Sequence, residues 1–533
     1  MVSDYDAVIV GAGHNGLVCG AYLARQGLKV CIVERRAVIG GACATEEIYP
    51  GFRASIAAYN LTLLQPKIML DLALLDHGLE VLKAPPLFEP FPDGGHILLW
   101  DDPQKTAAEL ARFSPEDAAQ YPLYLAHLRK LAPLIRRLMW ETPPDLQSGA
   151  LRDRWAALML LWRSRGLIRH IYDLQELLTM SAYDFLRRWF QNPDVIAVLG
   201  FYVSMSGSLL SLTSPGSAFF LIRVMIREGG TQAGGWGIPR GGMGAIADAL
   251  ARSGGRWGME VRTGDPVSEI VVTRGKATGV ALASGKRLAS RIVISNADLR
   301  TTFQRLLDPA LLPKEFAGAV ERFRGQGVLF KINLALDARP RFTAFAAARL
   351  DVDEPVLVRI GPSIGYFERA FEEAGQGAFS REPFMVTQLT TALDPAMAPP
   401  GKHVLSLLAG YAPYRLKGRS WAEAKPDLLA ATLKTLESYA PGITASILHA
   451  QVLTPEDLET VLGLPFGHVH HGDMALDQMF FRRPVAGYAR YRSPIAGLYM
   501  CGASNHPGGG VTGVPGHNAA REILGDRKRG LWR

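Results

Sequence analysis

The start of the chain constrains its fold more than any other segment. The stretch "DAVIVGAGHNGLVCGAYLARQGLKVCIVE" reads as a buried strand at residues 8–10, a glycine turn, a helix ending near Gly27 and a second strand at 29–33. In the turn, Gly11 allows a sharp bend, Gly13 lets the backbone approach a pyrophosphate, and Gly16 lets the helix pack closely on the strand. This unit predicts an α/β fold that binds a dinucleotide at the helix N-terminus.

An acid and a second glycine pair indicate which dinucleotide it is. Glu34 closes the second strand, where its carboxylate can accept hydrogen bonds from both ribose hydroxyls and would repel a 2′-phosphate. The pair Gly40 and Gly41 adds another close backbone approach, which is typical of an extended FAD. A purely structural glycine turn is disfavoured because strand, helix and acid all stand at the expected spacing.

A segment with three short strands follows in the middle of the chain. Residues 258–296 alternate in apolar character and predict a meander with strands at 267–273, 277–282 and 291–295. Flavoproteins of the glutathione-reductase-like fold carry such a meander, in which a residue near Val267 meets the adenine. A meander is also a common scaffold, so both interpretations stay open.

The end of the chain repeats the strand, glycine loop and helix pattern. The sequence "GLYMCGASNHPGGGVTGVPGHNAAREIL" predicts a strand at 498–501 and a helix from about 515 to 524. Gly502 could admit the ribityl and pyrophosphate region, and a helix starting near Val514 could point its positive end at the flavin pyrimidine. We therefore add four residues to the cofactor-binding candidates: Gly502, Gly513, Val514 and Asn518.

Four motifs together carry a family resemblance: the front glycine motif, "GGWGIPRGGMGAIADALA" (234–251), "HVHHGDMALDQMFFRRP" (468–484) and "GGGVTGVPGHNAA". In combination they resemble the phytoene-dehydrogenase-like flavoproteins, which include carotenoid desaturases and retinol saturase-like proteins. Within that family the chain is similar to the subgroup called pyridine nucleotide-disulfide oxidoreductase domain-containing. The resemblance covers nearly the whole chain and implies non-covalent FAD, a glutathione-reductase-like Rossmann domain and an apolar, polyene or isoprenoid substrate.

One departure from the family pattern concerns the pyrophosphate. Many relatives place an arginine directly after the second glycine pair, whereas this chain reads Gly40-Gly41-Ala42-Cys43. The phosphate charge must then be met elsewhere, and three arginines are candidates: Arg35, Arg36 and Arg53.

The expected domains alternate along the chain. Segments 1–75, 230–305 and 465–533 form the predicted FAD-binding domain, and segments 76–229 and 306–464 form an inserted α+β substrate domain. Its first part has a hairpin turning at 93–95 and a helical region at 101–229. Its second part has strand-like runs that predict an antiparallel sheet over the flavin, at 328–336, 355–360, 384–391 and 403–410.

Three polar residues are candidates for catalysis: His471, Asp473 and His506. A histidine titrates near neutrality and could move a proton, but an equal or better interpretation is that these groups hold loops around the cofactor. Hydrolase and metal motifs are missing, so no metal is expected. A second strand, glycine motif and helix unit is also missing, which makes a nicotinamide domain improbable and leaves oxygen or a quinone as electron acceptor.

Composition limits the partners and the location. The net charge of +8 is spread over scattered arginines, which does not indicate nucleic acid. The start of the sequence lacks a secretory pattern, and the four cysteines form no dithiol motif, so we expect a cytoplasmic protein. Residues 151–174 form a basic amphipathic helix that either touches a membrane interface or packs its apolar side on the domain. The sequence leaves open whether the chain forms homo-oligomers.

The predicted function is that of an FAD-dependent oxidoreductase. Hydride would pass to or from flavin N5 at a carbon–carbon bond of an apolar molecule. The alternatives are an isomerase or hydratase that needs reduced flavin without net redox, and a non-catalytic flavin-bearing interaction protein. An amine oxidase shares the fold but is a weaker interpretation, because Tyr488 and Tyr491 lie outside any recognisable aromatic cage motif.

Overall fold

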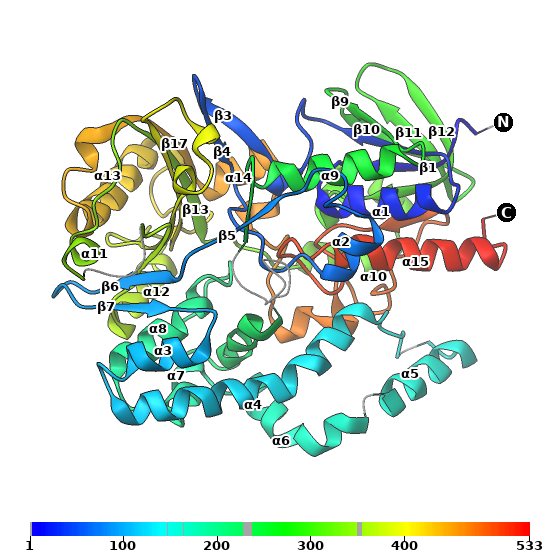
Figure 1. Cartoon of the computed structure of the whole chain (residues 1–533). Helices are drawn as coiled ribbons and strands as arrows, with labels where there is room; N and C mark the ends of the chain where they lie inside the picture. Colours follow the sequence, from blue (N-terminus) through cyan, green and yellow to red (C-terminus); the bar gives the residue numbers. More distant parts are fainter. Residues whose placement is uncertain (1–2, 147, 164, 227–236, 349–353, 533) are drawn as a thin grey trace.

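Two seven-stranded sheets at opposite ends of the molecule organise the fold (Figure 1). The computed structural model describes residues 3–146, 148–163, 165–226, 237–348 and 354–532. The predicted α/β class is confirmed. The predicted boundary at 229/230 and the start of the 234–251 motif lie outside the described residues, and the division into domain segments stays a prediction.

The first sheet has five parallel strands in the order β9, β2, β1, β12, β18. Their bounds are β9 (Glu260–Thr263), β2 (Val30–Glu34), β1 (Tyr5–Val10), β12 (Arg287–Ser295) and β18 (Leu498–Met500). Two antiparallel strands of the predicted meander, β10 (Val267–Thr273) and β11 (Lys276–Leu282), extend the sheet. The third strand starts at Arg287 instead of residue 291, because its first residues pair with β11 and its last ones with β1.

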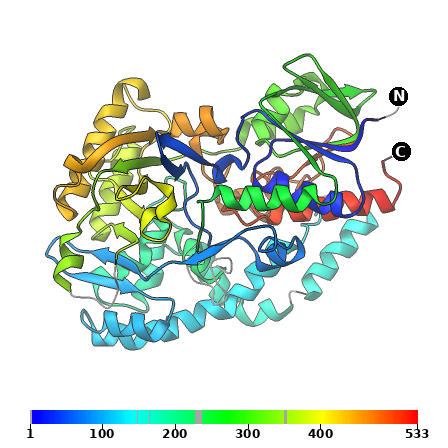
Figure 2. The same cartoon turned by 45° about the horizontal axis from the view of Figure 1, so that its top comes forward.

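Three helices cover one face of this sheet and run side by side in both views: α1 (His14–Arg25), α9 (Gly244–Gly255) and α15 (Val514–Lys528) (Figures 1 and 2). Ile9 and Ile32 of the strands meet Leu17, Ile246 and Ile523 of these helices in one buried cluster. The opposite face packs against the meander and α10 (Lys314–Arg322). The two ends of the chain thus meet on one sheet.

The second sheet contains all four predicted strands as β13 (Leu329–Leu336), β14 (Leu357–Ile360), β15 (Phe384–Leu389) and β16 (His403–Gly410). The sequence analysis did not foresee β17 (Ile447–Leu453), or that the hairpin strands β6 (Leu87–Pro90) and β7 (His96–Leu99) join the same sheet. The strand order is β17, β13, β16, β15, β14, β6, β7. All neighbours are antiparallel except β14 and β6, which are parallel.

Helices fill the region between and below the sheets, as the sequence predicts for residues 101–229 (Figure 1). They are α3 (Pro103–Leu110), α4 (Pro115–Trp140), α5 (Leu151–Arg163), α6 (Ile171–Thr179), α7 (Ala182–Arg187) and α8 (Pro193–Ser204). The other helices are α2 (Pro66–Asp71), α11 (Thr343–Ala348), α12 (Ile364–Gly375), α13 (Trp421–Tyr439) and α14 (Pro455–Leu462). Two small ribbons pair β3 (Thr45–Tyr49) with β4 (Phe52–Ser55) and β5 (Val81–Lys83) with β8 (Gly237–Pro239).

The described part of the chain lacks the features of a membrane-spanning helix or a metal centre. None of its helices has the length and apolar character needed to cross a membrane. Within the same residues, no three His, Cys, Asp or Glu side chains gather into a possible metal site. Cys19, Cys31, Cys43 and Cys501 are buried and unpaired.

A charged cluster fastens the C-terminal helix α15 beside strand β18. Arg492 donates from Nε and Nη2 to the carboxylate of Asp526 at 2.8 and 2.9 Å, and from Nη2 to Glu522 at 2.9 Å. Tyr499 of β18 donates to Asp526 at 2.8 Å. Arg529 also donates to Asp526, at 2.6 Å. Because Asp526 is only 2% exposed, its charge depends on these three donors.

We expect Arg492→Met to lower the free energy of unfolding by about 2–4 kcal/mol, because it removes the largest donor to a buried carboxylate. The matched control is Arg188→Met, which removes a surface pair with Glu176 and should cost less than about 1 kcal/mol. Urea unfolding at pH 7 measures both. Equal losses in the two variants would contradict the structural role of Arg492.

Candidate active site

The glycine turn between β1 and α1 forms a tight cradle. Gly11 has φ +94°, and a Cβ on Gly16 would lie 2.4 Å from the carbonyl oxygen of Gly11, so no side chain fits at that position. Glu34 at the end of β2 accepts hydrogen bonds from Ala12 N at 2.8 Å and Arg36 N at 3.0 Å. Each carboxylate oxygen keeps further acceptor capacity for a ligand hydroxyl.

A cavity of about 210 Å³, here called the β1–α1 cavity, opens over this cradle. Six of the predicted cofactor-binding residues line it: Gly11, Gly13, Glu34, Arg35, Gly41 and Val267. The sequence analysis missed other lining residues on the loop and helical turn after β12, namely Asn296, Asp298, Thr301 and Arg305. Only the pairing of β12 with β1 brings that loop to the glycine turn, which no local pattern reveals.

The remaining predicted cofactor-binding residues lie outside the cavity lining that the structure describes. Gly16 and Gly40 support the cradle from behind, where Gly40 N donates to Ala12 O at 2.8 Å. Gly502 lies so close to the loop after β12 that a Cβ would be 2.7 Å from Asn296 O. Gly513 and Val514 start α15, and the buried Asn518 donates to Met139 O at 2.9 Å.

The three arginines that could neutralise the phosphate charge differ in their position relative to the cavity. Arg35 lines the β1–α1 cavity and donates to Thr460 O and Val461 O. Arg36 also lines it, pairs with Glu46 at 2.6 Å, and keeps a buried Nη1 that bonds to no described residue. Arg53 is exposed and lies outside the lining. Arg36 and Arg305 are therefore the better-placed cations.

A second cavity of about 200 Å³, here called the sheet cavity, adjoins the first. Both are lined by His14, Ala42, Leu464, His471 and Ala503. The late glycines contribute Gly509 and Gly510, and one face of the second sheet forms the opposite wall. The two cavities together form a continuous site from the glycine cradle to the sheet.

Histidines at this junction are neutral. Burial lowers the pKa of His471 to about 4 and that of His14 to about 4. His471 Nδ1 and His14 Nε2 are buried and bond to no described residue. These two atoms are free to hydrogen-bond a ligand that spans both cavities.

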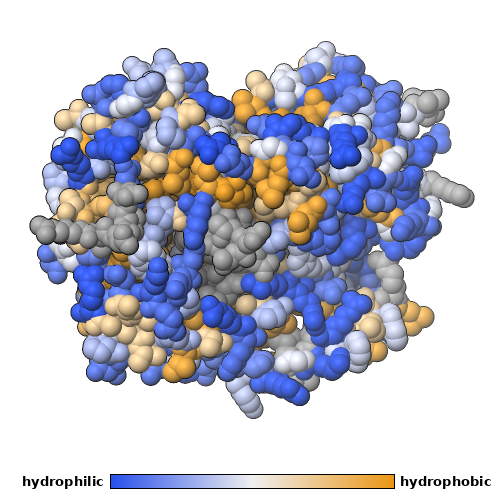
Figure 3. Space-filling view, in the orientation of Figure 1, coloured by the Kyte–Doolittle hydropathy of each residue, from blue (hydrophilic) through white to orange (hydrophobic). Residues whose placement is uncertain are grey.

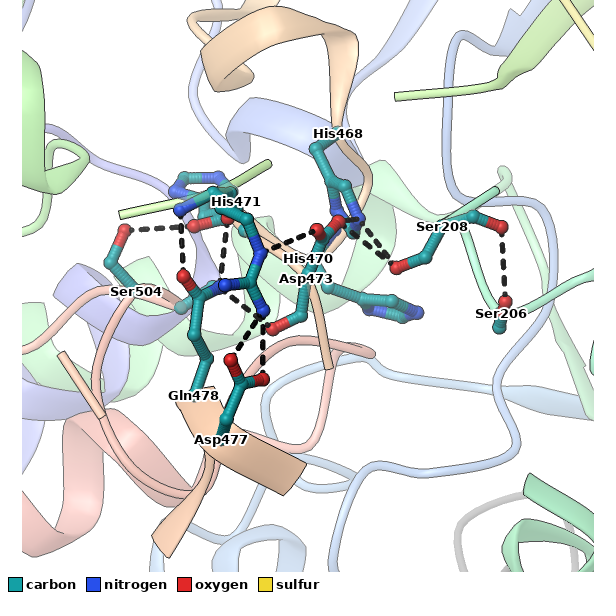
Figure 4. Close-up of polar contacts among 12 residues, drawn as sticks. Ser206, Ser208, His468, His470, His471, Asp473, Asp477, Gln478 and Ser504 are labelled. Atoms are coloured by element: carbon teal, nitrogen blue, oxygen red, sulfur yellow. Dashed lines mark hydrogen bonds and ion pairs between the residues drawn. The ribbon is translucent and has the colours of Figure 1, made fainter. Parts of the chain in front are cut away.

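The segment after residue 467 holds His471 in place. His468 Nε2 lies 3.2 Å from Asp473 Oδ1, and Ser208 Oγ contacts both at 3.2 and 3.1 Å, so the three side chains point toward one another (Figure 4). Burial opposes ionisation of Asp473, but the hydrogen bond from His468 keeps its pKa below the usual range. Asp473 is outside the lining of both cavities, so its position fits the loop-holding interpretation.

His506, the third catalytic candidate, lies away from both cavities. Its Nε2 is 2.7 Å from Leu138 O at the end of α4, and the residue is 1% exposed. Burial lowers its pKa to about 4. Of the three candidates, only His471 faces the site.

The wall of the sheet cavity is a row of cross-strand neighbours. Lys331 of β13 pairs with Leu408 of β16, Leu408 with Val386 of β15, and Val386 with Arg359 of β14. All four line the cavity. Three strand spacings place the two cations about 14 Å apart at the backbone, and the strip between them is apolar.

Lys331 is the residue that sequence analysis missed most clearly. It is 1% exposed, and its Nζ has no hydrogen-bond or ion-pair partner among the described residues, although it lies 5.3 Å from the ring centre of Tyr59. Burial lowers its pKa to about 7. The available signal was a lysine in the run "VLFKINLAL", whose other residues are apolar except Asn333, because a lysine is rarely fully buried without a partner.

Arg359, at the other end of the row, has a partner. Its Nε donates to Glu89 Oε2 at 2.7 Å, its Nη2 forms a second bond to that oxygen, and Nη2 also donates to Val198 O at 3.0 Å. Both residues are fully buried, and burial raises the pKa of Glu89 to about 7 against the opposing effect of Arg359. The rings of Phe201 and Tyr202 lie over the guanidinium at 4.5 and 5.1 Å.

Comparison with known proteins supplies the family. The model of the flavin-containing amine oxidoreductases matches residues 16–524. This chain belongs to that family. It is 38% identical to pyridine nucleotide-disulfide oxidoreductase domain-containing protein 2 of Rattus norvegicus over 98% of this chain and 94% of the relative.

More distant relatives extend over similar lengths. One of the subunits of the limonene dehydrogenase of Castellaniella defragrans is 29% identical over 100% of this chain and 96% of the relative. A neurosporene-forming phytoene desaturase of Cereibacter sphaeroides is 26% identical over 96% of this chain and 93% of the relative. The crystal structure of an oxidoreductase from Methanosarcina mazei has a TM-score of 0.60 at 19% identity, covers 97% of this chain and 99% of its own, and shows the same fold.

These relationships establish an FAD-dependent oxidoreductase and confirm the resemblance to the phytoene-dehydrogenase-like flavoproteins. The residues present fit the cofactor. The glycine cradle excludes side chains where a pyrophosphate would approach, Glu34 keeps acceptor capacity for ribose hydroxyls, and the free imidazole nitrogens of His14 and His471 lie where the two cavities meet.

We expect Gly16→Ala to abolish FAD binding, because the new methyl group would push the helix away from the glycine turn. The ratio of flavin to protein absorbance in the purified variant measures this. The matched control is Gly255→Ala at the end of α9, where a Cβ would meet open space and the FAD content should stay unchanged. Full FAD content in Gly16→Ala would contradict the assignment of the cradle.

We expect Lys331→Met to stabilise the protein at pH 7 by a few kcal/mol, on the order of 1.4 kcal/mol per unit of pKa shift. The native pKa of about 7 lies below the unfolded value near 10.4, so the unfolded state binds more protons between these values and stability rises with pH. The cost of burying the charge is full below pH 7 and vanishes above about pH 10.5.

Thermal melting at pH 6.5, 8 and 9.5 should therefore show the advantage of Lys331→Met shrinking as the pH rises. The exposed Lys314 provides the control, and Lys314→Met should give the same melting difference at each pH. A Lys331→Met variant that is less stable than the wild type at every pH would show that the amine is satisfied in the native protein.

Proposed function

We propose that this FAD-dependent oxidoreductase acts on a carbon–carbon bond of an apolar, polyene-like or isoprenoid-like molecule in the sheet cavity. The observation that carries the proposal is the lining of this cavity. It combines aliphatic and aromatic side chains, including Leu63, Phe201, Met205, Val386 and Leu408, and none of the lining residues that the structure describes is Asp or Glu.

The same lining argues against an amine substrate, in spite of the family's name. A protonated amine in this cavity would face Lys331 and Arg359 without a lining carboxylate to stabilise it. The tyrosines near the C-terminus supply no aromatic cage, because Tyr491 donates to His506 O and Tyr488 packs on Phe316. The relatives named for limonene and phytoene support an apolar substrate.

The cofactor assignment follows from the order of the two cavities. We assign the ADP half of FAD to the β1–α1 cavity and the flavin to its junction with the sheet cavity, in the extended pose of a glutathione-reductase-like domain. When bound there, FAD supplies the hydride acceptor or donor at N5. His471 lines both cavities, and the backbone of Gly509 and Gly510 lines the sheet cavity beside it, so these groups would orient the flavin, and the sheet wall would exclude water from the substrate.

Further partners stay proposals. We propose oxygen or a quinone as electron acceptor, no nucleic acid partner, and a cytoplasmic enzyme that touches a membrane surface and can form homo-oligomers. The membrane contact rests on α5, whose apolar side chains Trp155, Leu161 and Trp162 are 64%, 70% and 57% exposed instead of packing on the domain. Figure 3 shows small orange, hydrophobic areas among blue ones at the lower right, where Figure 1 places α5, and the α5 sequence also carries Arg152, Arg154 and Arg163.

We expect an anaerobic titration with an isoprenoid polyene to bleach the flavin absorbance of the purified protein, and air or a quinone to restore it. An aliphatic amine of similar length is the matched comparison and should leave the spectrum unchanged. Bleaching by the amine alone would contradict the proposal. Turnover that appears only after dithionite reduction, without electron consumption, would establish the isomerase or hydratase alternative, and a spectrum that no ligand changes would favour a non-catalytic protein.

A further inference from the structure

The first residue of helix α1 places an imidazole between the two cavities. His14 lines both the β1–α1 cavity and the sheet cavity, and its Nε2 is buried without a hydrogen-bond partner among the described residues. The helix begins after Gly13, with no side-chain cap and no acid in its first turn. The N–H groups of this helix end and the imidazole therefore border the same part of the site.

A buried thiol determines which nitrogen of this imidazole carries the proton. Burial raises the pKa of Cys43 to about 12, and its Sγ lies 3.8 Å from His14 Nδ1. The thiol keeps its proton and can donate a hydrogen bond to Nδ1. Burial lowers the pKa of His14 to about 4, so the ring is neutral and holds a single proton. With Nδ1 as the acceptor, that proton is at Nε2, which then acts as a donor.

The charged side chains of the β1–α1 cavity leave a need for such a donor. The acids in its lining are Glu34, Asp298 and Glu459, and the bases are Arg35, Arg36 and Arg305. Arg35 is bound to carbonyl groups near the end of α14, and Arg36 is paired with Glu46. Acids and bases in the lining balance, so a pyrophosphate needs neutral donors as well as cations.

The place of His14 in the chain favours the pyrophosphate over the flavin ring as its partner. His14 directly follows Gly13 of the glycine cradle, where the pyrophosphate approaches the helix end. The flavin would extend from the junction toward Gly509 and Gly510, which line only the sheet cavity. Ala42 also lines both cavities, but its methyl group offers no donor.

We propose that His14 is a cofactor-binding residue whose Nε2–H donates to the pyrophosphate of FAD, and that Cys43 holds the imidazole in the tautomer that allows this. An anion at Nε2 favours the same tautomer, because the other one would turn a lone pair toward its charge. A neutral imidazole thus serves where a cation could stand, since an arginine at position 42 would reach the same junction. The inference rests on the placement of the ADP half of FAD in the β1–α1 cavity.

Two ligands that share the diphosphate test this proposal on the full-length holoprotein. Dilution of the holoprotein gives the Kd of FAD from the fluorescence of released flavin, and displacement of FAD by ADP gives the Kd of ADP. ADP carries the diphosphate but lacks the flavin. We expect His14→Ala to weaken both ligands by the same factor of about 10 to 100, which corresponds to one hydrogen bond to a charged group.

Further variants separate the donor from the ring. His14→Gln keeps an N–H at the position of Nε2 and should retain most of the affinity. Cys43→Ala should weaken both ligands about two- to tenfold, and should have no effect in the His14→Gln background, because a glutamine has no tautomer to fix. Ala42→Arg should restore affinity to His14→Ala, where the imidazole no longer fills the junction. The matched control, His449→Ala, removes an imidazole of β17 outside both linings and should leave both Kd values unchanged.

Several results would overturn the inference. Unchanged Kd values in His14→Ala would show that the imidazole binds no part of FAD, and an equal loss in His14→Gln would show that the N–H is not what matters. Weakening of FAD without ADP would show that His14 binds the flavin half. Absence of any gain from Ala42→Arg in the His14→Ala background would place the diphosphate elsewhere. These outcomes leave the proposed reaction intact, whereas failure of ADP to displace FAD from the wild type would refute the placement of the ADP half itself.

Discussion

The site depends on one buried guanidinium. Arg483 is 0% exposed and donates to four backbone carbonyl oxygens, those of His470, Gly472, Asp473 and Ala503, at 2.8–3.4 Å. Burial lowers its pKa to about 10, so it remains charged at neutral pH. It joins the loop that carries His471 to the loop after β18, and these two loops form the floor where the cavities meet. Without this cation, four carbonyl groups would lose a charged donor at once, and among the described residues only that of Asp473 would keep another donor, Gln478 Nε2 at 3.4 Å.

The first sheet could be predicted because residues that lie close together in the sequence specify its first strand, turn and helix. Gly11, Gly13 and Gly16 stand in a short segment whose strand, turn and helix are each recognisable, and Glu34 follows at a fixed spacing. Four strands of the second sheet and the hairpin that joins it were also recognisable one by one, but β17 was not. Their order was not, because the pairing of β6 with β14 joins residues about 270 positions apart. The contact of Arg359 with Glu89 follows from that pairing, so periodicity could not predict it.

The C-terminal candidates show a second limit of sequence reasoning. A glycine or a helix start can serve either a ligand or a close backbone approach, and the two leave the same pattern. Gly502 approaches the loop after β12, and Asn518 holds the end of α4 through Met139 O. Gly509 and Gly510, a few residues away, line the sheet cavity instead. Only the path of the chain between β18 and α15 decides which of these neighbours faces the site.

The electrostatics of the site offer few side chains for proton transfer. The imidazoles of His14 and His471 are neutral at physiological pH, and Asp473 is committed to His468 and Ser208. Burial lowers the pKa of Lys331 in the sheet cavity to about 7. Arg359 in the same wall is held by Glu89, whereas the amine of Lys331 has no carboxylate among the described residues, so Lys331 is the basic group of this wall that is left to meet whatever occupies the cavity.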